Sequence, residues 1–162
     1  DFPDRIAGLL AETDIDPSML MVEITEQAAM ADVGLVTDIL TRLRLKNIAV
    51  ALDDFGAGYS SLVEIYRMPL SELKLDRSLI VDIGVSADAR TVVKALIALA
   101  RELKLPVCAE GIETIEIANF LRNTGCATAQ GFYFSRPLPA DTFREHIESQ
   151  PVDASAFQRR TA

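Results

Sequence analysis

Cysteine, histidine and tryptophan are nearly missing from this chain, and their scarcity narrows the chemistry it can perform. The two cysteines, Cys108 and Cys126, are too few for a disulfide framework. Because Cys108 lies in an apolar stretch of strand length, we expect reduced thiols and a cytoplasmic protein. The only histidine, His146, lies among charged residues near the C-terminus. A lone histidine argues against a histidine-based zinc site and against Ser-His catalysis.

Basic charge is also scarce. The chain has 16 Lys and Arg residues against 24 Asp and Glu residues, which gives a net charge of −8. Because no basic stripe is present to neutralise phosphates, we expect no DNA or RNA partner and no membrane contact. A small phosphorylated ligand held through metal ions remains compatible with this charge.

Long apolar runs are absent as well. The longest, residues 95–100, is flanked by Lys94 and Arg101 and is far too short to span a bilayer. No signal peptide is visible. The chain opens on Asp1 rather than on Met, which we interpret as a segment of a larger protein. A hydrophobic fraction of 49% over 162 residues is enough for the core of one globular domain.

The sequence alternates between two hydrophobic periods. Helical spacing predicts helices over residues 2–12, 33–45, 60–66, 89–103, 115–122 and 141–148. Short apolar runs predict strands over residues 20–25, 48–52, 72–75, 105–109 and 127–134. The longest helix is expected to bury Val92, Val93, Leu96, Ile97, Ala100 and Leu103.

This alternation predicts an α/β fold in which parallel strands are joined by right-handed crossovers. A closed barrel of this type needs eight strands and about 250 residues, whereas five strands are predicted here. We therefore expect that units of the barrel are missing before the first helix. We assign residues 1–150 to the domain and residues 151–162 to a polar tail.

Charged and polar residues follow or end each predicted strand. They are Glu23 and Glu26, Asp53 and Asp54, Lys74 and Asp76, Glu110 and Glu113, and Gln130. The carboxyl ends of parallel strands meet at one rim, where active sites of such folds lie. Carboxylates gathered on one rim repel each other unless cations lie between them. The pattern therefore indicates a metal-dependent enzyme, or a part of one.

Five motifs in order resemble the EAL-domain phosphodiesterases of bacterial cyclic di-GMP signalling. They are Glu-Ile-Thr-Glu at 23–26, Asp-Asp-Phe-Gly-Ala-Gly-Tyr-Ser-Ser-Leu at 53–62, Leu-Lys-Leu-Asp-Arg at 73–77, Ala-Glu-Gly-Ile-Glu-Thr at 109–114 and Gln-Gly-Phe-Tyr-Phe-Ser-Arg-Pro at 130–137. The resemblance implies a modified TIM barrel. It also implies hydrolysis of one phosphodiester of cyclic di-GMP to linear pGpG with Mg²⁺ or Mn²⁺, at a two-ion site in the full domain.

The chain also departs from the family pattern. The Glu-Ala-Leu strand that names the family is absent, and so is a later strand with a metal-ligating Asn. The resemblance therefore covers the C-terminal two-thirds of the domain, a partial TIM-type barrel with five parallel strands. It further implies a homodimer and upstream regulatory or sensory domains in the parent protein. Because part of the ligand set is missing, we expect this chain alone to be slow or inactive.

The resemblance also implies roles for individual residues. Glu23, Asp53, Asp54 and Glu110 would bind metal, with Asp53 as the bridge.

Glu110 and Lys74 would be catalytic, the first helping to deprotonate the nucleophilic water and the second orienting it or balancing phosphate charge. Gln130 and Asp54 would bind substrate, Glu26 would hold the loop after Asp54, and Glu113 would support the site. Asp76 shares a strand face with Lys74, which permits either a salt bridge or a catalytic pair.

Other interpretations stay open. An Asp-Asp pair before Gly is often a turn, and a lone lysine is usually a surface residue. Response-regulator receiver domains also combine an acidic pair, Mg²⁺ and a lysine on five parallel strands. In receivers, however, the pair closes the first strand, and neither Glu110 nor Gln130 has a counterpart. A catalytically inactive fragment or a cyclic di-GMP sensor is the closer alternative.

Overall fold

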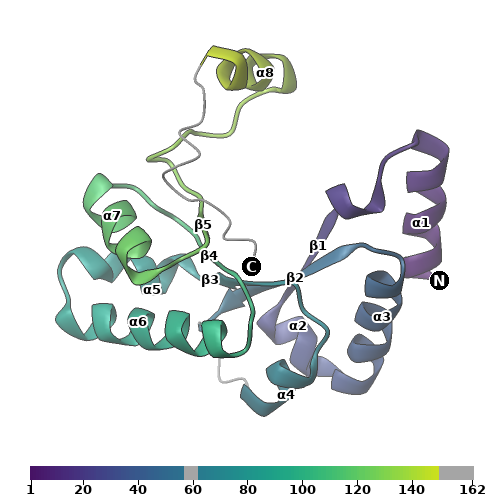
Figure 1. The fold of residues 1–162 in the computed structure, drawn as a ribbon, viewed down its shortest axis with the longest axis horizontal. Coiled ribbons are helices and arrows are strands. Elements are labelled where there is room, and N and C mark those ends of the chain that lie inside the picture. Colours follow the sequence, from purple (N-terminus) through teal and green to yellow (C-terminus); the bar gives the residue numbers. More distant parts are fainter. Residues whose placement is uncertain (57–61, 150–162) are drawn as a thin grey trace.

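A computed structural model of the chain describes residues 1–56 and 62–149. These residues contain one sheet of five parallel strands, in the order β1-β2-β3-β4-β5 (Figure 1). The strands are β1 (Met21–Thr25), β2 (Ala49–Phe55), β3 (Glu72–Leu75), β4 (Val107–Ala109) and β5 (Thr128–Ala129). The predicted α/β class, with five parallel strands in sequence order, is confirmed.

Helices connect successive strands and flank the sheet (Figure 1). They are α1 (Phe2–Thr13), α2 (Glu26–Ala31), α3 (Val33–Leu45), α4 (Leu62–Arg67), α5 (Arg77–Val81), α6 (Ala87–Glu102), α7 (Ile115–Thr124) and α8 (Ala140–Ser149). Two short 3-10 helices, η1 (Pro17–Met19) and η2 (Asp82–Gly84), precede β1 and α6. Within the described ranges, none of the helices combines the length and apolar character that crossing a membrane requires.

Two short helices that hydrophobic periodicity did not predict begin directly after strands. The side chain of Thr25 accepts a hydrogen bond from Ala28 N at the start of α2, and that of Asp76 accepts one from Ser78 N at the start of α5. Such N-caps satisfy backbone donors that the first turn leaves unpaired. At six and five residues, these helices are too short to show a periodic apolar face.

Two other expectations were wrong in detail. The predicted strand over 127–134 stops at Ala129, because the chain bends at Gly131 and Ile112 N then bonds to Gln130 O. On α6, Val93, Ile97 and Ala100 are buried as expected, but Val92 is 48% exposed. The buried stripe is therefore narrower than the apolar stripe in the sequence.

The core lies between the sheet and these helices. β3 alternates across the sheet: Leu73 and Leu75 are buried in the core, while Lys74 lies between them in sequence and points to the opposite face. Leu43 from α3, Ile97 from α6 and Leu121 from α7 complete the same cluster. Packing on one face thus leaves the other face of the sheet for polar groups.

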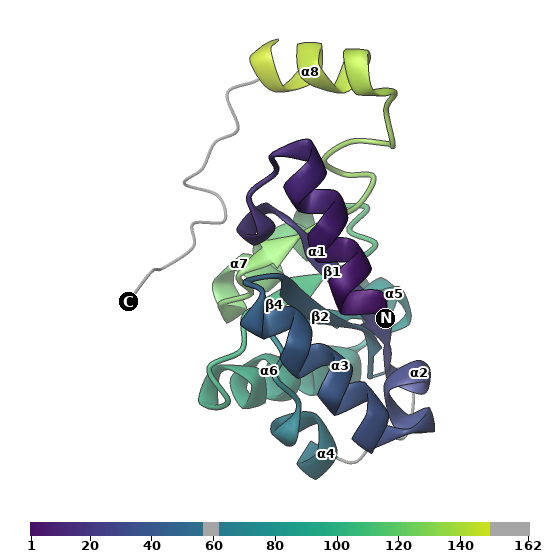
Figure 2. The ribbon, with the colours of Figure 1, turned by 90° about the vertical axis from the view of Figure 1, so that its right-hand side faces the viewer.

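The last helix, α8, lies apart from the rest of the chain in both views (Figures 1 and 2). None of its described residues is buried, and Phe143 and Ile147 are exposed. Two predictions fall outside the described residues: the assignment of residues 151–162 to a tail, and the start of the helix predicted over residues 60–66, at positions 60 and 61.

Candidate active site

The parallel sheet brings the carboxyl ends of five strands to one edge. Glu23 lies within β1, Asp53 and Asp54 lie near the end of β2, and Lys74 lies within β3. Glu110 and Gln130 each follow the last residue of their strands, β4 and β5. The register pairs Thr25 with Asp53 and Lys74 with Cys108, which fixes how far each strand extends toward this edge.

Lys74 is the centre of the site. Its ammonium nitrogen Nζ donates to Glu23 Oε2 at 2.7 Å and lies 2.6 Å from Glu110 Oε1 and 3.1 Å from Asp53 Oδ1. The Lys74 side chain is only 6% exposed. Burial alone would lower the pKa of Lys74, but its contacts with Glu110, Glu23 and Asp53 outweigh burial and raise the pKa above its ordinary value.

Asp53 differs from the other two acids around Lys74. Its Oδ1 atom is buried, and its ion pair with Lys74 lacks hydrogen-bond geometry, so the atom has no hydrogen-bond partner. A buried carboxylate oxygen without a hydrogen bond is costly unless another cation or water satisfies it. In this structure the nearest positive charge to this oxygen is the Lys74 ammonium at 3.1 Å.

Asp54 lies next to this cluster in an unusual backbone conformation. Its φ of 56° is in the left-handed region, and the β2–β3 pairing shifts register between Leu52 and Phe55. Such strain in a non-glycine residue is concentrated at functional sites. Burial, together with the nearby carboxylates of Asp53 and Asp76, raises the pKa of Asp54.

The described residues contain no group of three or more His, Cys, Asp or Glu side chains in an arrangement that could hold a metal ion as they stand. The Lys74 ammonium lies where Glu23, Asp53 and Glu110 converge. Asp54 forms no ion pair with Lys74. The charge of Lys74 nevertheless acts to lower the pKa of Asp54, against the carboxylates of Asp53 and Asp76, which raise it.

Glu26 connects β1 to the turn after Asp54. The Glu26 side chain is buried, and its Oε2 accepts a hydrogen bond from Gly56 N at 3.0 Å. Gly56 has a φ of 95°, and a side chain there would meet Leu79 Cδ1 at 2.5 Å. The positive φ, more than the contact with the flexible Leu79 side chain, therefore favours glycine at this turn. Gly58, the second glycine of the motif, lies outside the described residues.

Asp76 does not contact Lys74 as an ion-pair partner. Its side chain instead caps α5 through Ser78 N at 2.9 Å. These bonds to Ser78 outweigh burial and lower the pKa of Asp76. The ion pairs of Lys74 go instead to acids on or after other strands, so the structure contains no salt bridge between Lys74 and Asp76.

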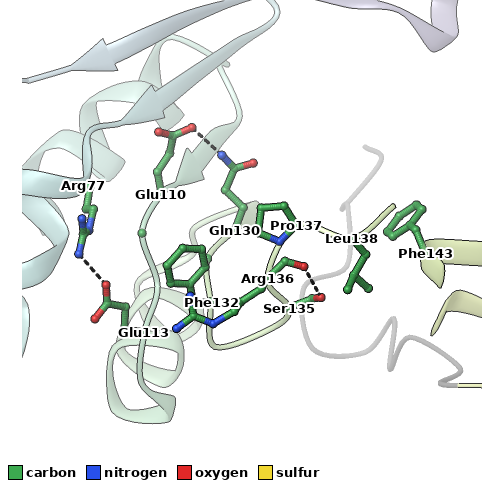
Figure 3. Close-up of a pocket in the computed structure, with 12 residues that line it drawn as sticks. Arg77, Glu110, Glu113, Gln130, Phe132, Ser135, Arg136, Pro137, Leu138 and Phe143 are labelled. Carbon is green, nitrogen blue, oxygen red and sulfur yellow. Dashed lines mark hydrogen bonds and ion pairs between the residues drawn. The ribbon is translucent and has the colours of Figure 1, made fainter. Parts of the chain in front are cut away.

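A cavity of about 630 Å³ opens beside Glu110 and Gln130 (Figure 3). Gln130 Nε2 donates to Glu110 Oε1 at 2.7 Å, so both side chains are fixed at the mouth of the cavity. Further along, the Arg136 guanidinium lies over the Phe132 ring, 4.5 Å from its centroid. The wall is thus partly aromatic and partly cationic.

The opposite wall carries an ion pair. Arg77, the first residue of α5, contacts Glu113 Oε1 at 2.6 Å (Figure 3). The aliphatic part of Arg77 packs over Gly111, where an added Cβ would lie 2.3 Å from Arg77 Cγ. Sequence reasoning identified Glu113 but missed Arg77, Phe132 and Arg136. The signal was present in the motifs at 73–77 and 130–137, which contain these residues.

The arrangement of the sheet and its charged edge defines the class of protein to which this chain belongs. A parallel sheet with acids and a lysine converging at its carboxyl edge is a barrel-type active-site rim. Residues 1–137 match the EAL domain, and the chain belongs to this family.

Relatives extend the comparison. The chain is 40% identical over 152 residues to "Cyclic di-GMP phosphodiesterase NbdA" of Pseudomonas aeruginosa, covering 94% of this chain and 19% of NbdA. It is thus about a fifth of the length of this curated relative. The structure of the PaMucR phosphodiesterase in complex with c-di-GMP matches with a TM-score of 0.83 and 40% identity, covering 86% of this chain and 57% of the chain in that structure.

A second similar structure was solved with a metal ion. BlrP1 of Klebsiella pneumoniae, in a manganese and cyclic di-GMP complex at pH 6, matches with a TM-score of 0.77 and 32% identity. The match covers 83% of this chain and 34% of BlrP1. A divalent metal ion is therefore present in a solved relative of the same family.

Proposed function

We propose that this chain is part of a catalytic domain that hydrolyses one phosphodiester of cyclic di-GMP to linear pGpG with the help of a divalent metal ion. One observation carries the proposal: carboxylates from three different strands converge on the buried Lys74. Membership of the EAL family and the relatives described above support the same reaction. Because the chain covers only 19% of NbdA, the activity is proposed for the whole protein.

The acidic residues of the rim fit a hard divalent cation. Mg²⁺ and Mn²⁺ prefer carboxylate oxygens, and Asp53 offers a buried oxygen that has no hydrogen-bond partner. Glu23, Asp53 and Glu110 would hold the ion, with Asp54 beside them. When bound, such an ion would neutralise phosphoryl oxygens and lower the pKa of a water molecule.

Glu110 is the proposed general base. Its Oε1 lies 2.6 Å from Lys74 Nζ and 2.7 Å from Gln130 Nε2, which fixes the carboxylate at the mouth of the cavity. It would take a proton from the attacking water as the new P–O bond forms. The P–O bond to the sugar oxygen then breaks, that oxygen takes a proton from solvent water, and Glu110 later returns its proton to solvent.

Lys74 and Gln130 would support this step without forming a covalent bond. The Lys74 ammonium compensates negative charge that accumulates on the phosphoryl oxygens. Gln130, hydrogen-bonded to Glu110, is positioned to contact the substrate or the attacking water.

The cavity beside Glu110 fits the size and chemistry of half of the substrate. Cavities that bind small ligands measure about 300–1,000 Å³, and this one is about 630 Å³. Phe132 and Arg136 present flat surfaces on which a guanine base could stack. The proposal also includes a homodimer, upstream sensory or regulatory domains and a cytoplasmic location for the parent protein.

Turnover by the intact protein tests the proposal. Cyclic di-GMP is incubated with Mn²⁺, Mg²⁺ or EDTA, and pGpG is quantified by chromatography. We expect metal-dependent pGpG formation that falls by about 100-fold or more in Glu110→Gln. The matched control, Glu116→Gln, changes an exposed glutamate at the start of α7 and should retain activity.

Two outcomes would contradict the proposal. Full activity in Glu110→Gln would remove Glu110 from the role of base. Tight binding of cyclic di-GMP without any pGpG would identify a sensor instead.

A further inference from the structure

We infer that Lys74 is the internal counter-ion of the metal site: its ammonium holds Glu23, Asp53 and Glu110 together when no metal is bound and competes with a divalent cation for their oxygens. The inference rests on the proposed function only in taking this rim as a metal site. It assigns Lys74 a role in the assembly of the site, in addition to the charge compensation during hydrolysis.

The geometry is that of a coordinated cation. Lys74 Nζ lies within 3.1 Å of three separate carboxylates: it donates a hydrogen bond to Glu23, and its contact with Asp53 is an ion pair without hydrogen-bond geometry. These acids come from β1, β2 and the end of β4, so no local segment holds them together. Lys74 itself is fixed by the backbone of β3, whose Leu73 and Leu75 are buried in the core. The strand thus delivers a positive charge to one point of the rim.

The charges show why such a group is needed. Three ionised carboxylates and one ammonium leave the cluster with a formal charge of −2, which one divalent cation would balance. Without Lys74, three negative charges would lie close together at a partly buried site. Like charges in such surroundings repel strongly, and a buried charge that loses its partner is strongly destabilising.

Competition follows from the same contacts. The oxygens that Lys74 approaches at 2.6–3.1 Å are those that a divalent cation would bind. A bound cation and the ammonium would also repel each other at short range. The incoming ion must therefore displace Lys74 or share the carboxylates with it. Removing the ammonium should strengthen metal binding, whereas removing a residue that merely positions the ligands would weaken it.

The test uses Lys74→Met in the intact protein without cyclic di-GMP. In EDTA, we expect the melting temperature of this domain to fall by about 6 °C or more, and Mn²⁺ to restore most of the loss. Calorimetric titration should give Mn²⁺ binding about tenfold tighter than in the unchanged protein. Lys94→Met is the matched control, because Lys94 is an exposed lysine of α6 that lies over the Phe120 ring. It should change neither quantity in this way.

A double variant separates the counter-ion role from simple loss of packing. Adding Glu23→Gln to Lys74→Met removes one of the three acids, so the melting temperature in EDTA should rise above that of the single variant. If Lys74→Met unfolds under all conditions, recovery of folding in the double variant supports the inference. Failure to recover would contradict it.

Two further results would overturn the inference. One is an unchanged melting temperature of Lys74→Met in EDTA, and the other is Mn²⁺ binding that is equal to or weaker than in the unchanged protein. Because no measurement involves cyclic di-GMP, a failed turnover assay would contradict the proposed function but not this role of Lys74.

Discussion

Two ion pairs near the cavity have the same length but different surroundings. Lys74–Glu110 and Arg77–Glu113 both measure 2.6 Å. The Lys74 and Glu110 side chains are 6% and 18% exposed, whereas Arg77 and Glu113 are 63% and 47% exposed. Water and salt screen the second pair and barely reach the first. Burial, rather than distance, therefore separates the proposed catalytic centre from the rim of the cavity.

The largest expected effect is the loss of activity when the partly buried acid Asp53 is neutralised. Asp53→Asn in the intact protein should lower kcat/KM for cyclic di-GMP by about 100-fold or more, because it removes the charge of a proposed metal ligand. Steady-state kinetics with saturating Mn²⁺ measures this. Asp38→Asn, at an exposed position of α3, is the control. Equal kinetics of the two variants would place the reaction elsewhere.

Next in size is a backbone effect at the mouth of the cavity. An added Cβ at Gly131 would lie 2.2 Å from both the N and O atoms of Ile112, and backbone atoms cannot rotate away. Gly131→Ala should therefore lower the free energy of unfolding by about 2 kcal/mol or more in urea titrations.

Gly8→Ala is the matched substitution. Gly8 lies within α1 and has no atom within 4 Å of an added Cβ, so alanine should stabilise by about 0.4–1 kcal/mol. Similar effects of both substitutions would show that the close approach of Gly131 to Ile112 is not maintained in solution.

A smaller effect depends on pH. The pKa of Asp76 is lowered by its bonds to Ser78, so its ionised form stabilises the folded chain above its unfolded pKa of 3.8. Asp76→Ala should cost about 1 kcal/mol at pH 7, as for other N-caps. The difference should shrink as pH falls through and below the unfolded pKa. Urea unfolding at several pH values measures it, and a difference that grows in acid would contradict the account.

The smallest effect is expected at the exposed pair. Glu113→Gln should change the free energy of unfolding by no more than about 0.5 kcal/mol, and added salt should reduce the difference further. Urea titrations at low and high salt measure this. A loss of several kcal/mol would show that exposure does not distinguish this pair from the Lys74 cluster.

Much of the fold could be predicted because it depends on local patterns. Runs of apolar residues identified all five strands, and the alternation with helices implied that they are parallel. The helices α2 and α5 were missed because they are shorter than two turns and depend on capping by Thr25 and Asp76. The end of β5 was missed because it depends on the close approach of Gly131 to the backbone of Ile112. These residues are distant in sequence, so no local turn pattern reveals their contact.

The residues that form the site could be predicted from the sequence, but their contacts with one another could not. Residues such as Glu23 and Lys74 stood out because each interrupts an apolar strand. Their meeting depends on strand register, which the sequence does not display, and a shared strand face suggested Asp76 as a partner of Lys74. Arg77 and Arg136 were missed because an arginine next to a motif looks like any exposed arginine until the fold places it on a cavity wall.

The central claim is that Glu23, Asp53 and Glu110 form the metal-binding centre of a phosphodiesterase. Anomalous diffraction from crystals of the intact protein grown with Mn²⁺ tests it most directly. The account predicts an anomalous peak within bonding distance of Asp53 and at least one of the other two acids, with Lys74 Nζ shifted from its metal-free position. Fully occupied manganese elsewhere, with Lys74 still among the three carboxylates, would contradict it.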